Sequence, residues 1–422
     1  MIDRVIVAGG GTGGHLFPGM AVVEELRRRK PDVKVVFVGT ARGIEGRVLP
    51  ARGEQLELME VRPLMGRGAL DVTRNLALLP AGFARAARIL ALHRPDLVLG
   101  LGGYSAGPIV LAAAFRRTPT ALLEQNAHVG LTNRMLAKAV GRAYLSFPET
   151  AAHFRPARAR ALGNPVRRAF VEAARLAAAD PVGFEARARQ VLVLGGSQGA
   201  RALNQHVPRA LAELGLDRRG IRVVHQTGPD MVSGVADRYR ELGLEADVVP
   251  FIDDMARAYA RALLVIGRAG ATTLAELCAI GRPAILVPYP HAAEDHQRHN
   301  ALALQKAGAA IVIGERELGR GALVAAFKTL MVDTTRRRRM AEAARACGQP
   351  DAAAAVVDDL VAWLGRADAS YPEPSGVAAC ETGTTSSDEL QLHASASLRR
   401  RPKVKRGTLR LRTVDSQLDA TG

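Results

Sequence analysis

Short apolar runs alternate with longer amphipathic stretches along the first half of the chain. The predicted strands cover residues 4–8, 33–38, 97–101 and 121–124, and helical periodicity appears at 18–29 and 76–93. Strands that alternate with helices in this way favour a parallel, doubly wound α/β sheet.

The second half repeats the pattern. Predicted strands cover residues 190–194, 221–226, 247–250, 263–266 and 284–288, with a helix from about Arg201 and further helices at 321–331, 335–347 and 352–364. Gly163-Asn164-Pro165 interrupts the pattern between the halves. We therefore expect two Rossmann-like domains, at 1–163 and 164–368.

The character of the chain changes beyond about residue 369. Ser, Thr, Gly, Pro and Glu dominate up to Ser397, and a basic stretch follows at 399–406. This composition predicts a disordered basic tail over 369–422. A solvated tail with no required role is favoured over one that contacts membrane or nucleic acid.

Composition narrows the function classes. The net charge of +17 favours anionic partners, but aromatic residues make up only 4% and no nucleic-acid-binding motif is present, so we expect no nucleic-acid partner. Three widely spaced cysteines fit a reducing compartment better than a disulfide framework. The sequence shows no signal peptide and no apolar run of about 20 residues, which predicts a protein that is neither secreted nor transmembrane.

A glycine-rich loop at 9–15 follows the first strand and opens a helix. Glycines permit tight turns and close approach of a ligand, and the free N–H groups of a helix start attract negative charge. The dinucleotide fingerprint is matched formally, but it requires an acidic residue after the second strand. Gly39-Thr40 stands there and Glu45 comes later, which argues against NAD. His15, at the end of the loop, is a candidate proton acceptor.

Two similar turns lie in the second half. The loop at 195–200 contains Ser197, which can donate to a phosphate oxygen, and the turn at 268–273 precedes a helix that contains Glu276. Glu276 can interact with the helix dipole or accept hydrogen bonds from two ribose hydroxyls. Together the loops predict a site for a nucleotide diphosphate between the two halves.

A polar cluster follows the strand at 284–288. It contains His291, Glu294, Asp295, His296 and His299, but its spacing matches no strong metal signature. The rim of a polar pocket is therefore favoured over a metal site, and no metal is predicted.

As a set, these motifs resemble the MurG family of bacterial peptidoglycan glycosyltransferases. The matching segments are GGGTGGHLFP (9–18), GLGGYSAGP (100–108), EQNAHVGLTNRMLA (124–137), GNPVR (163–167), GGSQGARALN (195–204), HQTG (225–228), PFIDDMARAYARA (250–262), GRAGATTLAEL (267–277) and PYPHAAEDHQRHNA (288–301). The resemblance extends to about residue 365. One departure is Leu123, where many members have histidine.

The resemblance implies a GT-B fold, in which two Rossmann-like domains face each other across a cleft. It implies an inverting transfer of N-acetylglucosamine from UDP-GlcNAc to undecaprenyl-pyrophosphoryl-N-acetylmuramoyl-pentapeptide (lipid I), without a cofactor. Residues that would contact the donor are Thr12, Gly13, Gly14, Asn126, Arg167, Ser197, Ile252, Ala271, Thr272, Thr273, Leu274, Ala275, Glu276 and Gln297. The chemistry of the third turn adds Gly270 and Arg268 near the diphosphate, and His15 is the candidate general base.

The acceptor implies peripheral attachment to the cytoplasmic face of the bacterial inner membrane, with other cell-wall synthesis proteins as candidate partners. Between residues 62 and 88, apolar side chains alternate with arginines. The apolar residues are Leu64, Met65, Leu70, Leu76, Leu79 and Phe83, and the arginines are Arg62, Arg67, Arg74, Arg85 and Arg88. Such a stretch fits a patch that contacts an anionic leaflet. A core-facing amphipathic helix with a solvated basic face explains it equally well.

Three alternatives remain at this point. One is another GT-B enzyme, such as a UDP-sugar transferase acting on diacylglycerol or a UDP-N-acetylglucosamine 2-epimerase. Another is a non-catalytic partner of the cell-wall machinery, although the intact loops argue against it. The third, an NAD-dependent dehydrogenase, lacks the acidic residue near position 39.

Overall fold

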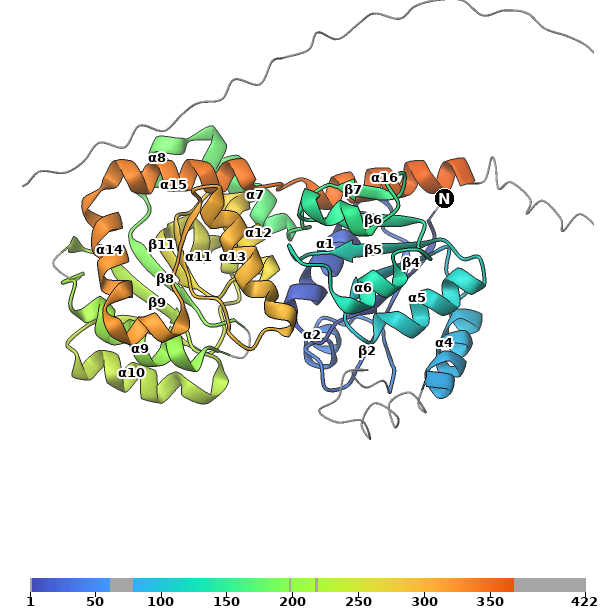
Figure 1. Ribbon diagram of the computed structural model, residues 1–422, viewed down its shortest axis with the longest axis horizontal. Coiled ribbons are helices and arrows are strands. Elements are labelled where there is room, and N and C mark those ends of the chain that lie inside the picture. Colours follow the sequence, from blue (N-terminus) through green and yellow to red (C-terminus); the bar gives the residue numbers. More distant parts are fainter. Residues whose placement is uncertain (1, 61–78, 197–198, 217–218, 368–422) are drawn as a thin grey trace, which may run out of the picture. The chain divides into compact units, whose positions relative to one another are not determined.

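A computed structural model describes residues 2–60, 79–196, 199–216 and 219–367, which belong to one compact unit. The unit contains a seven-stranded sheet and a six-stranded sheet, and every strand pairing in both is parallel. Figure 1 shows the strands of each sheet with the helices packed around them. The predicted α/β class is confirmed.

The first sheet has the strand order β3-β2-β1-β4-β5-β6-β7. Its strands are β1 (Arg4–Gly9), β2 (Lys34–Gly39), β3 (Leu56–Leu58), β4 (Leu97–Gly102), β5 (Thr120–Glu124), β6 (Arg142–Leu145) and β7 (Ala159–Ala161). The helices between them are α1 (Gly13–Arg29), α2 (Glu45–Ala51), α4 (Leu79–His93), α5 (Ala106–Phe115), α6 (Leu131–Leu136) and the 3-10 helix η1 (Pro148–His153).

The second sheet has the order β10-β9-β8-β11-β12-β13. Its strands are β8 (Gln190–Leu194), β9 (Arg222–Gln226), β10 (Ala246–Val249), β11 (Ala262–Gly267), β12 (Ala284–Leu286) and β13 (Ala310–Val312). Its helices are α7 (Arg168–Ala179), α8 (Pro181–Ala186), α9 (Arg201–Ala212), α10 (Val232–Glu241), α11 (Met255–Arg261), α12 (Ala271–Ile280), α13 (His296–Lys306), α14 (Ala322–Val332) and α15 (Thr334–Cys347), with short 3-10 helices η3 (Pro229–Met231), η4 (Ala293–Asp295) and η5 (Glu315–Arg320).

Alternate residues of each strand belong to different cores. In β1, Val5 and Val7 pack with α1, whereas Ile6 and Ala8 pack with α4 and α5. The second sheet is divided in the same way, between a core with α9 and α14 and a core with α7 and α12. Because side chains on a strand alternate between its two faces, four cores on two sheets mean that both faces of each sheet are covered.

The last helix, α16 (Ala352–Ala367), packs against the first sheet. Val356, Val357, Leu360 and Leu364 join the core beside α1, and Asp359 accepts hydrogen bonds from β6. Figure 1 shows α16 beside β6 and β7. Sequence order alone had grouped this helix with the second half, because its apolar pattern does not reveal which sheet it covers. The domain boundaries themselves stay predictions.

Several sequence predictions can be compared with these elements. α1 begins at Gly13, five residues before the predicted start, so the end of the glycine loop lies inside the first helical turn. The short strands β3, β6, β7 and β13 were missed. The predicted tail and most of the predicted apolar and basic patch, at 61–78, lie outside the described residues. Among the helices that are described, none is long and apolar enough to span a bilayer.

Candidate active site

In each sheet the strand order reverses beside its first strand. β1 lies between β2 and β4, and β8 lies between β9 and β11. Ligands of doubly wound proteins bind outside the carboxyl ends of the strands at such a reversal. Glycine-containing turns follow β1, β4, β8 and β11, at 9–14, 102–103, 195–196 and 267–270. The topology therefore places every glycine-rich turn found in the sequence at a point where a ligand is expected.

The turns after β1 and β4 touch each other. A Cβ on Gly9 would lie 2.5 Å from the carbonyl oxygen of Gly102, and a Cβ on Gly103 would lie 3.0 Å from that of Gly10. Gly9 and Gly10 also have φ values of 132° and 151°, which disfavour other residues. Close packing of backbone on backbone therefore requires these glycines.

Glu45, at the start of α2, is fully buried against the first glycine turn. Its carboxylate accepts hydrogen bonds from the N–H of Gly11 (2.7 Å) and from the N–H and hydroxyl of Thr40 (both 3.0 Å). The carboxylate fills space that a Cβ on Gly10 or Gly43 would need, at 2.4 Å and 2.2 Å. In the sequence Glu45 counts only against an NAD site, whereas in the structure its carboxylate holds the turn in place.

The imidazole of His15 lies beside the turn after β4. Its Nδ1 is 3.1 Å from Thr12 Oγ1, and a Cβ on Gly102 would lie 3.4 Å from its Nε2. Burial, and to a smaller extent nearby His296, lowers the pKa of His15 to about 4, against the opposing field of Glu45. The ring is therefore neutral at neutral pH. With the proton on Nδ1 and donated to Thr12, Nε2 keeps a lone pair that can accept a proton.

A second buried carboxylate, Glu124, organises the loop after β5. It accepts from the N–H and side-chain amide of Asn126 (3.0 and 3.4 Å), from the N–H of Gly130 (3.2 Å) and from the amide of Asn133 (2.9 Å). Burial raises the pKa of Glu124. The preceding residue, Leu123, is buried in the core beside α1, so a side chain at that position faces the core.

The start of α12 contacts the start of α1. The hydroxyl of Thr272 donates to the carbonyl oxygen of Gly14 at 3.2 Å. This carbonyl would ordinarily accept from the residue four positions later, which is Pro18 and has no N–H. The N-terminus of α12 has no side-chain cap, and Gly270 is its N-cap residue. The N–H groups of its first turn are therefore free to bind an anion next to the first glycine turn.

Arg167 and Glu276 form an ion pair at 2.7 Å, with side chains that are 20% and 7% exposed. The guanidinium of Arg167 also lies 5.1 Å from the ring centres of both Phe17 and Phe170. Burial raises the pKa of Glu276, and Arg167 opposes this effect. The carboxylate predicted to bind ribose is thus near the start of α12 but engaged with a cation, and the buried Nε of Arg167 has no partner among the described residues.

Arg268 is held by other contacts. It donates to the carbonyl oxygens of Val287 (3.2 Å) and Pro288 (3.3 Å), pairs with Glu315 at 2.5 Å and lies over the ring of Tyr289. Its charge is therefore already neutralised by Glu315. These contacts hold the guanidinium in place, and its contact with a diphosphate stays a prediction.

Ile252 and Gln297 are both engaged through their polar atoms. The N–H of Ile252 donates to Gln226 Oε1 at 3.1 Å, and Gln226 Nε2 donates to the carbonyl oxygen of Gly196 at 2.9 Å. The side-chain oxygen of Gln297 accepts from the N–H of Tyr289 at 3.0 Å. A base that pairs with the N–H of Ile252 would displace Gln226, whose role here was not found from the sequence.

The other predicted donor contacts lie along α12. Leu274 and Ala271 are buried, so only their backbone can meet a ligand, and Ala275 is partly buried against the core. The carbonyl oxygen of Thr273 accepts from Tyr259 at 3.3 Å. Ser197 lies outside the described residues.

The polar cluster at 291–299 is dispersed among several contacts. Glu294 pairs with Arg134, Asp295 with Arg298, and His299 stacks on His128. Within the described ranges, no group of three or more His, Cys, Asp or Glu side chains is arranged to hold a metal ion. The absence of a metal requirement stays a prediction.

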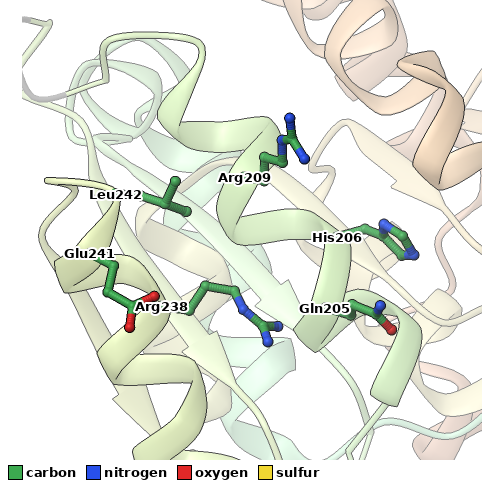
Figure 2. Close-up of a pocket in the computed structure, with 6 residues that line it drawn as sticks. All are labelled: Gln205, His206, Arg209, Arg238, Glu241 and Leu242. Atoms are coloured by element: carbon green, nitrogen blue, oxygen red, sulfur yellow. The ribbon is translucent and has the colours of Figure 1, made fainter.

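A pocket of about 360 Å³ lies apart from these residues, between α9 and α10 (Figure 2). It is lined by Gln205, His206, Arg209, Arg238, Glu241 and Leu242. Pro208 explains the position of Arg238, because its missing N–H leaves the carbonyl of Asn204 to accept from that guanidinium at 3.1 Å. None of the predicted site residues lines this pocket.

Known proteins match this chain in sequence and in fold. Residues 5–145 match the glycosyltransferase family 28 N-terminal domain, and residues 190–356 match the glycosyltransferase family 28 C-terminal domain. A protein of Anaeromyxobacter dehalogenans (strain 2CP-C) is 49% identical over 357 residues, covering 84% of this chain and 91% of that protein. A protein of Geobacter sulfurreducens is 45% identical, and the match covers 85% of this chain and 98% of that protein. Both carry the name UDP-N-acetylglucosamine--N-acetylmuramyl-(pentapeptide) pyrophosphoryl-undecaprenol N-acetylglucosamine transferase.

Among solved structures, MurG of Acinetobacter baumannii matches with a TM-score of 0.67 at 31% identity, covering 84% of this chain and 98% of that chain. The chain belongs to the MurG family. Membership in the MurG family confirms the predicted GT-B fold and glycosyltransferase class. The UDP-GlcNAc 2-epimerase of Neisseria meningitidis, at 14% identity and a TM-score of 0.59, covers 85% of this chain and 100% of that chain and shares the fold alone.

Replacing Glu45 by Gln tests its role in holding the first glycine turn of this MurG-family chain. A glutamine brings an NH₂ group toward the N–H groups of Gly11 or Thr40, so at least one buried donor loses its partner. We expect the free energy of unfolding, measured by urea denaturation, to fall by about 1–3 kcal/mol. The exposed Glu149→Gln is the matched control and should be neutral. Equal stability of the two variants would contradict this role for Glu45.

Proposed function

We propose that this chain transfers N-acetylglucosamine from UDP-GlcNAc to the 4-hydroxyl of the muramoyl sugar of lipid I, producing lipid II for peptidoglycan synthesis. The proposal rests on relatives of that printed name, which are 45–49% identical and match over 91–98% of their length. The contact between the first glycine turn and the start of α12 supports it, because a sugar nucleotide and an acceptor must meet between two such turns.

The donor would lie mainly on the second sheet. Its diphosphate would accept from the free N–H groups at the start of α12, with Gly270 allowing close approach, and from Ser197. Glu276 would exchange part of its contact with Arg167 for the ribose hydroxyls, and Arg167 would then meet the diphosphate through its unpaired Nε. The backbone of Ile252 would contact the base through its carbonyl oxygen, or through its N–H once Gln226 is displaced.

The sugar would face the first glycine turn. Thr12, Gly13, Gly14, Asn126 and Gln297 would contact it, and the backbone of residues 271–276 would line the other side. Arg268 would lie near the diphosphate and would keep the turn after β11 in place through its carbonyl contacts. None of these interactions needs a metal or a cofactor, because N–H groups and arginine can stabilise a leaving diphosphate.

His15 would act as the general base. The acceptor oxygen attacks the anomeric carbon, its proton passes to Nε2 of His15, and the bond from the anomeric carbon to the diphosphate oxygen breaks with inversion. A pKa of about 4 keeps the free ring neutral and ready to accept this proton. The bound diphosphate would raise the pKa of His15 toward neutrality, because a nearby anion favours the imidazolium. Donor binding would therefore strengthen the base.

Product analysis tests the proposed reaction. The full chain is incubated with radiolabelled UDP-GlcNAc and a lipid I analogue, and the products are separated by chromatography. We expect a labelled lipid-linked disaccharide that appears only with the acceptor. A labelled epimer formed without acceptor would identify an epimerase, and transfer to diacylglycerol would identify a different transferase. Either result, or no product, would overturn the proposal.

The His15→Ala variant tests the base. General-base catalysis contributes about 10²–10⁴-fold, so kcat should fall by that order. UDP binding, measured by calorimetry, should change little because UDP would contact the other half. The exposed His153→Ala is the matched control and should keep full activity. Near-normal turnover of His15→Ala would eliminate this residue as the base.

We also propose attachment to the anionic cytoplasmic face of the inner membrane. The net charge of +17 supports it, as do Leu92 and Phe115, which end α4 and α5 with exposures of 69% and 77%. Phe83, which we had grouped with the patch, packs instead against the core, and Arg85 pairs with Glu57 at 2.9 Å. The burial of Phe83 therefore fits the interpretation of α4 as a core-facing amphipathic helix. Arg88, in contrast, is exposed and could contact the membrane.

Charge reversal tests this surface. Changing Arg67, Arg74 and Arg88 together to Glu should abolish sedimentation with phosphatidylglycerol-containing liposomes, because each basic residue near an anionic surface contributes about 1 kcal/mol. Arg85 is left unchanged because of its ion pair. Reversal of Arg316, Arg320 and Arg339, which are exposed in the second half, alters the net charge equally and should leave binding intact. Equal loss in both variants would point to net charge alone.

A further inference from the structure

Asn300 of α13 is fully buried, and its side-chain amide contacts loops of both halves. Its Oδ1 accepts from the N–H of Ala127 at 2.8 Å. Its Nδ2 donates to Asn126 Oδ1 at 3.2 Å and to the carbonyl oxygen of Ala269 at 3.3 Å. One side chain therefore connects the loop after β5 in the first sheet with the turn after β11 in the second.

The hydrogen-bonding capacity of this amide is almost fully used. An asparagine has two N–H donors, and both have partners here. Ala127 and Ala269 lie in loops, so these backbone groups have no strand or helix partner to replace Asn300. A substitution that removes the amide would leave three polar groups without this partner, around a side chain that is fully buried.

The contacts of Asn300 also determine which way the Asn126 amide faces. Asn126 Nδ2 donates to Glu124 Oε1, and Asn126 Oδ1 accepts from Asn300. With both ends engaged, the amide cannot flip without losing a hydrogen bond. Asn300 also follows Gln297 by one helical turn, and Ala269 precedes Gly270, the N-cap residue of α12. Two parts of the proposed donor site therefore contact this one side chain, and a third lies one turn earlier on the same helix.

Other contacts between the same segments are more exposed. Glu294 pairs with Arg134 at 2.5 Å and lies 3.6 Å from His128, with side chains about one-third exposed, and His128 stacks on His299 at 5.5 Å. Solvent screens such pairs, so they add little to the alignment of the loops. The buried amide of Asn300 is the contact that water cannot replace.

We propose that Asn300 is a positioning residue for glycosyl transfer. It fixes the orientation of the Asn126 amide and the distance between the loop after β5 and the start of α12, so that the sugar and the diphosphate are held in one geometry. This inference rests on the proposed function. Loss of the amide should therefore slow transfer while the chain still folds. UDP should still bind, because it would contact mainly the second half.

The test compares Asn300→Ala with Gln305→Ala, which removes an exposed amide from the same helix. Assays with UDP-GlcNAc and a lipid I analogue, below the melting temperature of each variant, should show that kcat/KM of Asn300→Ala falls about 10²-fold, as for a displaced reacting group. The Kd for UDP should stay within threefold, and Gln305→Ala should match the unmodified chain. A kcat/KM within threefold of the unmodified chain, or a loss of UDP binding equal to the loss of turnover, would overturn the inference.

The Asn300→Asp variant keeps the shape of the side chain and covers the case in which Asn300→Ala does not fold. A carboxylate accepts from Ala127 but cannot donate to Asn126 or Ala269. The ratio of its kcat/KM to that of the unmodified chain should be low at pH 8 and should rise toward pH 5, because a protonated carboxyl regains one donor. A ratio that does not change with pH would contradict the positioning role. If the unmodified chain itself gives no disaccharide, the proposed function fails rather than this inference.

Discussion

Buried backbone amides in the turns after the parallel strands need hydrogen-bond partners, and a few side chains supply them. Glycines let the turns pack closely, but the same packing excludes water from their N–H and carbonyl groups. Glu45 satisfies the turn after β1, Glu124 the loop after β5, and Asn300 the loop after β5 and the turn after β11 together. The positions of His15, Asn126 and the start of α12 depend on these three side chains.

Prolines inside helices also leave backbone groups that side chains of other elements satisfy. Pro18 leaves the carbonyl of Gly14 without its helical partner, and Thr272 of the other half donates to it. Pro208 leaves the carbonyl of Asn204 open in the same way, and Arg238 donates to that group. The carbonyl that each proline leaves without a helical partner thus accepts from a side chain of another element. In the first case the acceptor lies at the proposed active site.

Much of this arrangement was predictable from the sequence, for reasons that are local. Apolar runs of strand length gave the long strands, and the glycine turns that follow them gave the places where a ligand is expected. Short strands such as β7 carry too few apolar residues to be recognised. Glu45 and Asn300 could not be found in one sequence, because their role arises from partners 34 and 173 residues away in the chain. Ile252 and Arg268 were placed near the donor by type and position, but the sequence does not show that Gln226 and Glu315 hold them.

The return of the chain to the first sheet has a mechanical consequence. The chain passes to the second sheet between β7 and α7, and it comes back between α15 and α16. These two crossings lie against each other, since a Cβ on Gly163 would lie 2.4 Å from that of Gln349. Two adjacent covalent crossings act as one hinge line. Such crossings would let the halves rotate about that line and would resist sliding, so we expect any opening between the halves to widen on the side away from Gly163.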